Sequence, residues 1–168
     1  MNDEKENLHR LFDTYGLKLL RYATSILLNK QDAEDIVQEV FVTAYKKSHL
    51  FDGQNEQAWL YKITYNKCIN HKKRLSLLTW EKSEALDQVE AVMPDEISET
   101  MQKALQGLKD KERMVLYMRV VEGYNYEDLT QITGESVATL RKRYERTKQK
   151  IKKLLEQQAH DPKTHMVI

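Results

Sequence analysis

The sequence predicts an all-helical protein of two small domains joined by a linker. Apolar residues recur every three or four positions along most of the 168-residue chain, which is typical of amphipathic helices. Only two prolines and five glycines are present, so we expect long helices and few turns. From Ser76 to about Asp95 the periodicity fades, and residues 81–100 carry seven acidic side chains and one basic one. We therefore expect a helical domain on each side of an acidic linker.

The first domain, residues 1–76, is predicted to contain three helices. The first carries an apolar stripe that begins at Leu8, and we expect it to end at Asn29. The second follows directly, with acidic residues in its first turn, where they favour the helix dipole. Asp52 and Gly53 break the pattern, and a third helix is expected from about Glu56 to Leu75.

The second domain, residues 97–157, follows a linker over residues 77–96 and precedes a tail over residues 158–168. A helix begins with Ile97, and Asp110 can cap the next helix, which Gly123 should end. Asn125 can cap a short helix that ends at Gly134. Ser136 is then a suitable cap for the last long helix.

The last two helices have the pattern of a helix-turn-helix, a short helix and a longer one joined by a turn with glycine. One face of the long helix is basic and begins at its amino end, where a recognition helix meets the major groove of DNA. This basic face comprises Thr139, Lys142, Arg143, Arg146 and Lys150. An ordinary solvated helix could carry the same charges, but the turn and the caps favour DNA binding.

The third helix has a second basic face. Residues 61–80 contain five basic side chains and no acidic one, and aromatic residues lie among them. Cations and aromatic rings together suit unstacked single-stranded nucleic acid, because rings stack on bases while cations hold the backbone. Most of these aromatic side chains are nevertheless expected in the core.

Two stretches resemble a known family. "DAEDIVQEVFVTAYKKSHLFDG" (32–53) and "AWLYKITYNKCINHKKR" (58–74) are similar to region 2 of bacterial sigma factors of the extracytoplasmic-function group. "LKDKERMVLYMRVVEGYNYEDLTQITGESVATLRKRYERTKQKI" (108–151) resembles region 4 of the same group. The two stretches occur in the expected order and cover most of the chain.

The resemblance implies a transcription initiation factor with three contact surfaces. The surface for the clamp coiled coil of the polymerase β′ subunit is implied to include Asp35, Gln38 and Glu39. The surface that opens and captures the −10 promoter element is implied to include Asp52, Asn55, Lys62, Asn66, Asn70 and Arg74. Region 4 is implied to lie near the polymerase β flap and to read the −35 element with Ser136, Thr139, Lys142, Arg143 and Arg146. Promoter DNA is therefore expected both as duplex and as melted strand, and an anti-sigma factor is a further implied partner.

Several positions differ from the usual pattern of region 4. Thr130 and Thr133 replace residues that are often apolar, and Tyr144 and Glu145 replace a more typical leucine and histidine. Glu135 occupies a turn position that is usually apolar. Near DNA its carboxylate would repel phosphate unless it accepts a hydrogen bond from a cytosine amino group, and both roles remain open.

The sequence contains no recognisable catalytic, metal or cofactor motif. The five glycines are isolated, and the five histidines form no HExxH pair. Cys68 and His71 could supply half a metal site, but a buried cysteine beside a surface histidine is the expected arrangement. We expect no enzymatic activity, no cofactor and no insertion into a membrane, and a single cysteine favours the cytoplasm.

Two other functions fit the pattern less well. A stand-alone helix-turn-helix regulator would bind paired half-sites as a symmetric dimer, and an all-helical adaptor would bind an acidic protein. Only the sigma factor requires RNA polymerase. We also hypothesise that the acidic residues 81–100, with Glu84, Asp87 and Glu90, shield the basic segments before polymerase binds.

Overall fold

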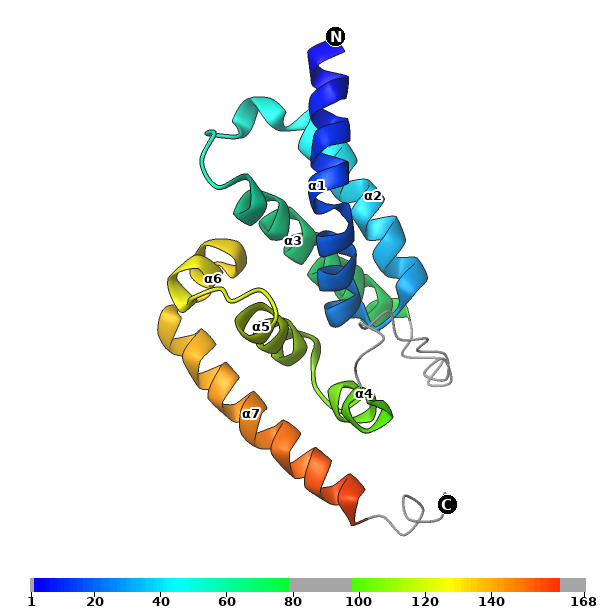
Figure 1. Cartoon of the computed structure of the whole chain (residues 1–168), viewed down its shortest axis with the longest axis vertical. Helices are drawn as coiled ribbons and strands as arrows, with labels where there is room; N and C mark the ends of the chain where they lie inside the picture. Colours follow the sequence, from blue (N-terminus) through cyan, green and yellow to red (C-terminus); the bar gives the residue numbers. More distant parts are fainter. Residues whose placement is uncertain (1, 79–97, 161–168) are drawn as a thin grey trace.

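The computed structural model describes residues 2–78 and 98–160, and every regular element in these ranges is a helix (Figure 1). The predicted all-helical fold is confirmed. The predicted linker and tail lie largely outside the described residues, as do Ile97 and the three linker acids named above.

The first half is a bundle of three long helices, α1 (Asn2–Leu27), α2 (Lys30–Lys46) and α3 (Glu56–Leu78). Each buries its apolar stripe against the other two, and Leu19, Ala33 and Leu60 are fully buried where the helices meet. The prediction that Asn29 ends the first helix was wrong. α1 ends at Leu27, and the Asn29 side chain instead caps α2 by accepting a hydrogen bond of 2.9 Å from the backbone N–H of Asp32.

A tight loop joins α2 to α3 through the 3₁₀ turn η1 (Ser48–Leu50). Gly53 and Asn55 both adopt left-handed backbone, with φ of 80° and 45°. Glycine reaches this conformation without steric cost, and asparagine tolerates it better than most residues. The Asn55 side chain then accepts a 3.0 Å hydrogen bond from the N–H of Ala58, which caps the start of α3.

The second half consists of α4 (Glu99–Gln106), α5 (Asp110–Val120), α6 (Tyr126–Thr133) and α7 (Val137–Ala159). The predicted caps Asn125 and Ser136 are confirmed, and Gly134 ends α6 with φ of 74°. Asp110 does not cap α5, because Lys109 stands at the cap position and Asp110 is already helical. α5 also ends three residues before Gly123, at Val120.

The two halves pack against each other rather than standing apart. α5 lies on α1, α6 lies on α3, and one continuous apolar core runs through both halves. Tyrosine rings fill the boundary: Tyr22 of α1 lies 4.8 Å from Tyr61 of α3 and 6.2 Å from Tyr117 of α5, measured between ring centroids. This packing had no signal in the sequence. None of the described helices is long and apolar enough to cross a membrane.

Candidate nucleic-acid and polymerase interfaces

The helix-turn-helix is held together by buried apolar side chains and by threonine hydroxyls. Leu129 and Ile132 of α6 pack against Leu140 of α7, and all three are buried. Thr130 and Thr133 donate hydrogen bonds of 3.0 and 2.9 Å to backbone carbonyls four residues earlier. Because these bonds satisfy the hydroxyls locally, α6 accommodates threonine at positions where apolar residues are more usual.

The amino-terminal half of α7 carries the predicted basic face. Ser136, Thr139, Lys142 and Arg146 are exposed, as residues that contact DNA must be. Arg143 differs from them, because its side chain is only 19% exposed. The structure therefore divides the five predicted residues into four exposed side chains and one half-buried arginine.

Glu135 is the partner of that arginine. Its carboxylate accepts hydrogen bonds from both terminal nitrogens of Arg143, one of them at 3.0 Å, and another of 3.1 Å from Lys111 Nζ of α5. Burial by itself would raise the pKa of Glu135, but the bonds from Arg143 and Lys111 outweigh it and leave the pKa lowered. Glu145, the other acidic residue in question, forms an exposed 3.0 Å pair with Lys148.

The α3 residues of the predicted −10 surface lie on one exposed face of that helix. Lys62, Asn66, Asn70 and Arg74 are all exposed and follow one another at helical spacing. Tyr61 and Tyr65, by contrast, are buried in the core. The face is thus polar and basic, with its aromatic neighbours turned inward.

An open recess of about 370 Å³ lies between the loop before α3, the start of α3 and α6. Asp52, Asn55, Trp59 and Lys62 line it, and the Trp59 ring packs at 4.9 Å from the Phe51 ring. Asp52 also accepts a 2.9 Å hydrogen bond from the Gln54 N–H, which fixes the loop. Gln131 of α6 reaches the cavity from the second half of the chain, a contact that sequence reasoning missed.

The predicted polymerase surface lies on α2, on the side away from the core. Asp35, Gln38 and Glu39 are exposed, and Glu39 lies 3.5 Å from Lys67 of α3. Val42, one turn after Gln38, is 52% exposed and adds an apolar side chain to this face. Its helical spacing from Gln38 was a usable sequence signal.

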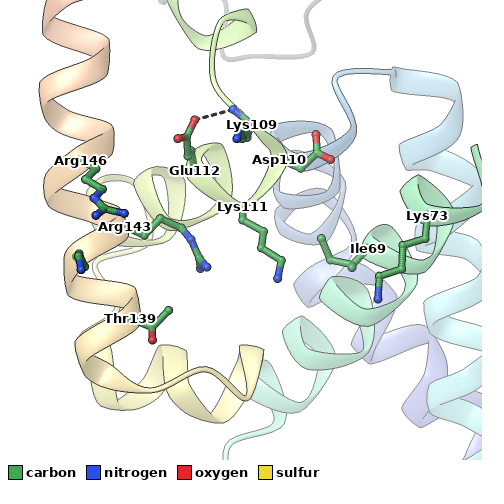
Figure 2. A pocket seen from close by; sticks show the side chains of 10 residues that line it. Ile69, Lys73, Lys109, Asp110, Lys111, Glu112, Thr139, Arg143 and Arg146 are labelled. Carbon is green, nitrogen blue, oxygen red and sulfur yellow. Dashed lines mark hydrogen bonds between the residues drawn. The ribbon is translucent and has the colours of Figure 1, made fainter. Parts of the chain in front are cut away.

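A second cavity, of about 550 Å³, lies between α3, α5 and α7. Figure 2 shows Arg143 and Arg146 of α7 on one side, Ile69 and Lys73 of α3 on the other, and Lys111 of α5 between them. Thr139 and Lys142 also line it, so the predicted −35 residues face α3 across this space. Its volume is that of a small-ligand pocket.

The remaining chemical candidates are structural. Cys68 is fully buried, and burial raises its pKa to about 12, which makes the thiol unreactive. His71 lies 3.2 Å from Asp32 rather than beside the cysteine sulfur in a shared site. In the part of the chain that the structure describes, no three His, Cys, Asp or Glu side chains are grouped as metal ligands.

Both halves match known families. Residues 11–77 match Sigma-70 region 2, and residues 98–151 match Sigma-70, region 4. The chain is 31% identical to the RNA polymerase sigma-H factor of Pseudomonas aeruginosa, with 84% of this chain and 82% of that protein covered. It is 26% identical to the ECF RNA polymerase sigma factor SigW of Bacillus subtilis, with 86% and 87% covered.

Solved structures share the fold. The sigma factor RpoE from Bartonella quintana, in complex with the anti-sigma factor NepR, aligns with a TM-score of 0.74 at 24% identity. That alignment covers 93% of this chain and 98% of the other. CnrH, in complex with the cytosolic domain of CnrY, aligns with a TM-score of 0.64 at 24% identity, over 94% and 91%.

Two sigma regions in order, on a fold shared with solved sigma factors, define a transcription initiation factor. The chain belongs to the sigma-70 family of RNA polymerase sigma factors, in its extracytoplasmic-function group. Its function is to direct core RNA polymerase to promoters. This identification replaces the stand-alone regulator and the adaptor as explanations of the basic helices.

Proposed function

We propose that the exposed polar face of α3 and the loop before it bind the melted −10 element. The observation that supports this most is the exposure of all six assigned residues. Asp52, Asn55 and Lys62 line the recess beside the loop, and Asn66, Asn70 and Arg74 follow Lys62 along α3. Lysine and arginine hold the strand backbone, while amide side chains can pair with unstacked base edges. Flipping a base costs a few kcal/mol, about what contacts in a fitted pocket return.

The amino end of α7 reads the −35 element in the same proposal. Ser136, Thr139, Lys142 and Arg146 are exposed on one side of a helix whose first turn is free of acidic residues. Arginine can contact guanine through two hydrogen bonds, and lysine contacts guanine or phosphate. Arg143 belongs to this face by position, although its guanidinium is held by Glu135.

The outer face of α2 is the proposed contact for the clamp coiled coil of the polymerase β′ subunit. Asp35 and Glu39 supply negative charge that complements a basic partner. Gln38 adds a polar contact, and Val42, one turn further along α2, adds an apolar one. The region-4 half would lie near the β flap.

Promoter binding then requires the two halves to separate. In the described arrangement part of the −35 face lines a cavity against α3, and Gln131 of α6 lines the −10 recess, so each promoter surface borders the other half of the chain. The two promoter elements are also about 25 base pairs apart along the duplex, whose rise is about 3.4 Å per pair. One compact unit cannot span that length.

The remaining parts of the proposal follow from the family. The protein acts in the cytoplasm, has no enzymatic activity of its own, and serves a stress or envelope response. An anti-sigma factor holds it inactive; this part of the proposal is supported by the solved structure of RpoE, which is in complex with the anti-sigma factor NepR.

Transcription in vitro tests the residue assignments. Core polymerase with the wild-type protein is compared with Asn66→Ala, Arg146→Ala and Gln38→Ala variants on one promoter. We expect Asn66→Ala to impair strand opening, Arg146→Ala to lower discrimination at one −35 base, and Gln38→Ala to weaken binding to core polymerase. Equal activity of all three variants would contradict the assignments.

A further inference from the structure

The first inference concerns Glu135, and it rests on the proposed −35 function of α7. Glu135 lies between Gly134, the left-handed residue of the turn, and Ser136, the cap of α7. Its carboxylate therefore sits where the turn enters the recognition helix. From there it binds Arg143, two helical turns further along α7, and Lys111 of α5.

The pair uses the same atoms that base recognition would need. Arg143 reads a guanine only if two of its N–H groups point together at the base edge. Both terminal nitrogens are already directed at Glu135. Pulling Arg143 away would leave a half-buried carboxylate without its main partner, which costs more than one good base contact returns.

Burial separates Arg143 from its neighbours. The Arg143 and Glu135 side chains are 19% and 20% exposed, whereas Thr139, Lys142 and Arg146 are classed as exposed. The three-way contact also ties the turn, α7 and α5 together. This arrangement fixes the angle at which α7 leaves the turn.

We propose that Glu135 is a positioning residue that holds Arg143 against the turn, so that Arg143 braces α7 and the −35 bases are read by its exposed neighbours. The carboxylate faces inward to two cations and is neutralised by them, so it neither repels phosphate nor reads cytosine. The sequence left two roles open for Glu135, repulsion of phosphate and recognition of cytosine. Positioning of Arg143 replaces both.

The test uses holoenzyme on promoters with a fixed −10 element and a randomised −35 element. Arg143→Ala should lower initiation by a similar factor on every −35 sequence and leave the base preference unchanged. Glu135→Gln should change the preference, because Arg143 is released toward the groove. Arg146→Ala is the matched control and should reduce discrimination at one position by about 5–150-fold. Loss of preference at a single position in Arg143→Ala would overturn the proposal.

Thermal unfolding of the full chain separates this proposal from the −35 assignment. If Arg146→Ala leaves the base preference intact, the assignment of −35 recognition to this face is wrong. Thermal unfolding can still show whether Glu135 and Arg143 form a stabilising pair. The double variant Glu135→Gln with Arg143→Ala should unfold no earlier than Arg143→Ala alone, because both remove one pair. Additive losses of melting temperature would refute the brace.

A second inference rests on a different contact, the side chain of Arg113. This arginine lies on α5 and is only 4% exposed. It donates hydrogen bonds of 2.9 and 2.8 Å to the carbonyls of Ser25 and Ile26, in the last turn of α1, and a further one to Leu108. Asp110 pairs with it at 2.7 Å.

The contact joins the two sigma regions through a helix end. Carbonyls in the last turn of a helix lack partners within it, and a cation there also complements the helix dipole. The planar guanidinium directs donors to both halves at once in a fixed fork, a geometry that the compact ammonium of lysine does not reproduce. In the same closed arrangement Thr139, Lys142 and Arg146 stay exposed but line a cavity against α3, and Gln131 lines the −10 recess.

We infer that Arg113 is a latch that keeps the free protein closed and off DNA until polymerase separates the halves. In Arg113→Lys, we expect a larger radius of gyration in solution scattering and promoter-fragment binding by the free protein that is about 5–150-fold tighter. Arg119→Lys is the matched control, since Arg119 of α5 bonds to the Tyr124 carbonyl within its own half.

Circular dichroism of Arg113→Lys should show unchanged helix content. A second measurement uses the wild-type protein and so does not depend on how the variant folds. The solution scattering of the wild-type protein without polymerase should fit the structure with its two halves packed together. Wild-type scattering that fits separated halves would overturn the latch. An equally compact Arg113→Lys with unchanged DNA binding would overturn it as well.

Discussion

Replacing Tyr22 with phenylalanine should stabilise the protein. Tyr22 is fully buried at the boundary between the halves, and its hydroxyl has no hydrogen-bond partner among the described residues. Burial accordingly raises the pKa of this phenol well above its usual value. Phenylalanine would keep the ring contacts with Tyr61 and Tyr117 and remove only the unpaired oxygen.

The magnitude follows from the cost of burying an unpaired polar group. That cost is about 1–3 kcal/mol, so Tyr22→Phe should raise the free energy of unfolding by at least about 1 kcal/mol. For a chain of this size each kcal/mol corresponds to an increase of about 2–4 °C in melting temperature. Because the Tyr22 ring also contacts Tyr117 of α5, part of the added stability should favour packing of the two halves over their separation.

Urea unfolding measures the effect directly. The midpoint for Tyr22→Phe should rise while the slope of free energy against urea stays the same. Tyr45→Phe is the control, since Tyr45 is exposed and should change stability by less than about 0.5 kcal/mol. A loss of 1 kcal/mol or more in Tyr22→Phe would refute the reasoning, because it would mean that the hydroxyl is paired in solution.

Three further predictions use other contacts. The lowered pKa of Glu135 stabilises the fold at neutral pH, and this contribution is lost progressively as the pH falls below the ordinary carboxyl value of 4.5 and through the folded-state pKa. Glu135→Gln should therefore be most destabilising at pH 7 and progressively less so at more acidic pH in urea unfolding. Gly107→Ala should change the free energy of unfolding by less than about 1 kcal/mol, because the added Cβ meets only the flexible end of the Leu154 side chain and the φ of −74° at Gly107 suits alanine; thermal melting checks this, and a larger loss would contradict it. Val42→Ala should weaken binding to core polymerase by about 1 kcal/mol with unchanged DNA specificity, as measured by competition binding, and Val42→Leu should bind normally.

Local features of the fold could be predicted because single residues decide them. Asn125 and Ser136 cap their helices, and Gly134 ends α6, since the capping side chains and the left-handed backbone need no tertiary context. Asn29 was misread because asparagine suits both the end of one helix and the start of the next. Asp110 lost the cap position because its carboxylate pairs with Arg113.

The relation between the halves could not be predicted. Tyr22 and Tyr61 look like core residues of the first bundle, and nothing in their spacing shows that they also meet the second half. Arg113 is one of many cations, and its burial depends on carbonyls of α1 that any sequence would supply. Glu135 was recognised as unusual, but its partners Lys111 and Arg143 come together only in the fold.

Transcription with core RNA polymerase free of other sigma factors tests the central claim most directly. The protein is added to a library of promoter fragments, and the 5′ ends of the transcripts are sequenced. We predict discrete start sites that share motifs about 10 and 35 base pairs upstream and that are lost when Arg143 and Arg146 are both replaced by alanine. An absence of start sites, together with tight binding of duplex DNA by the protein alone, would contradict the account.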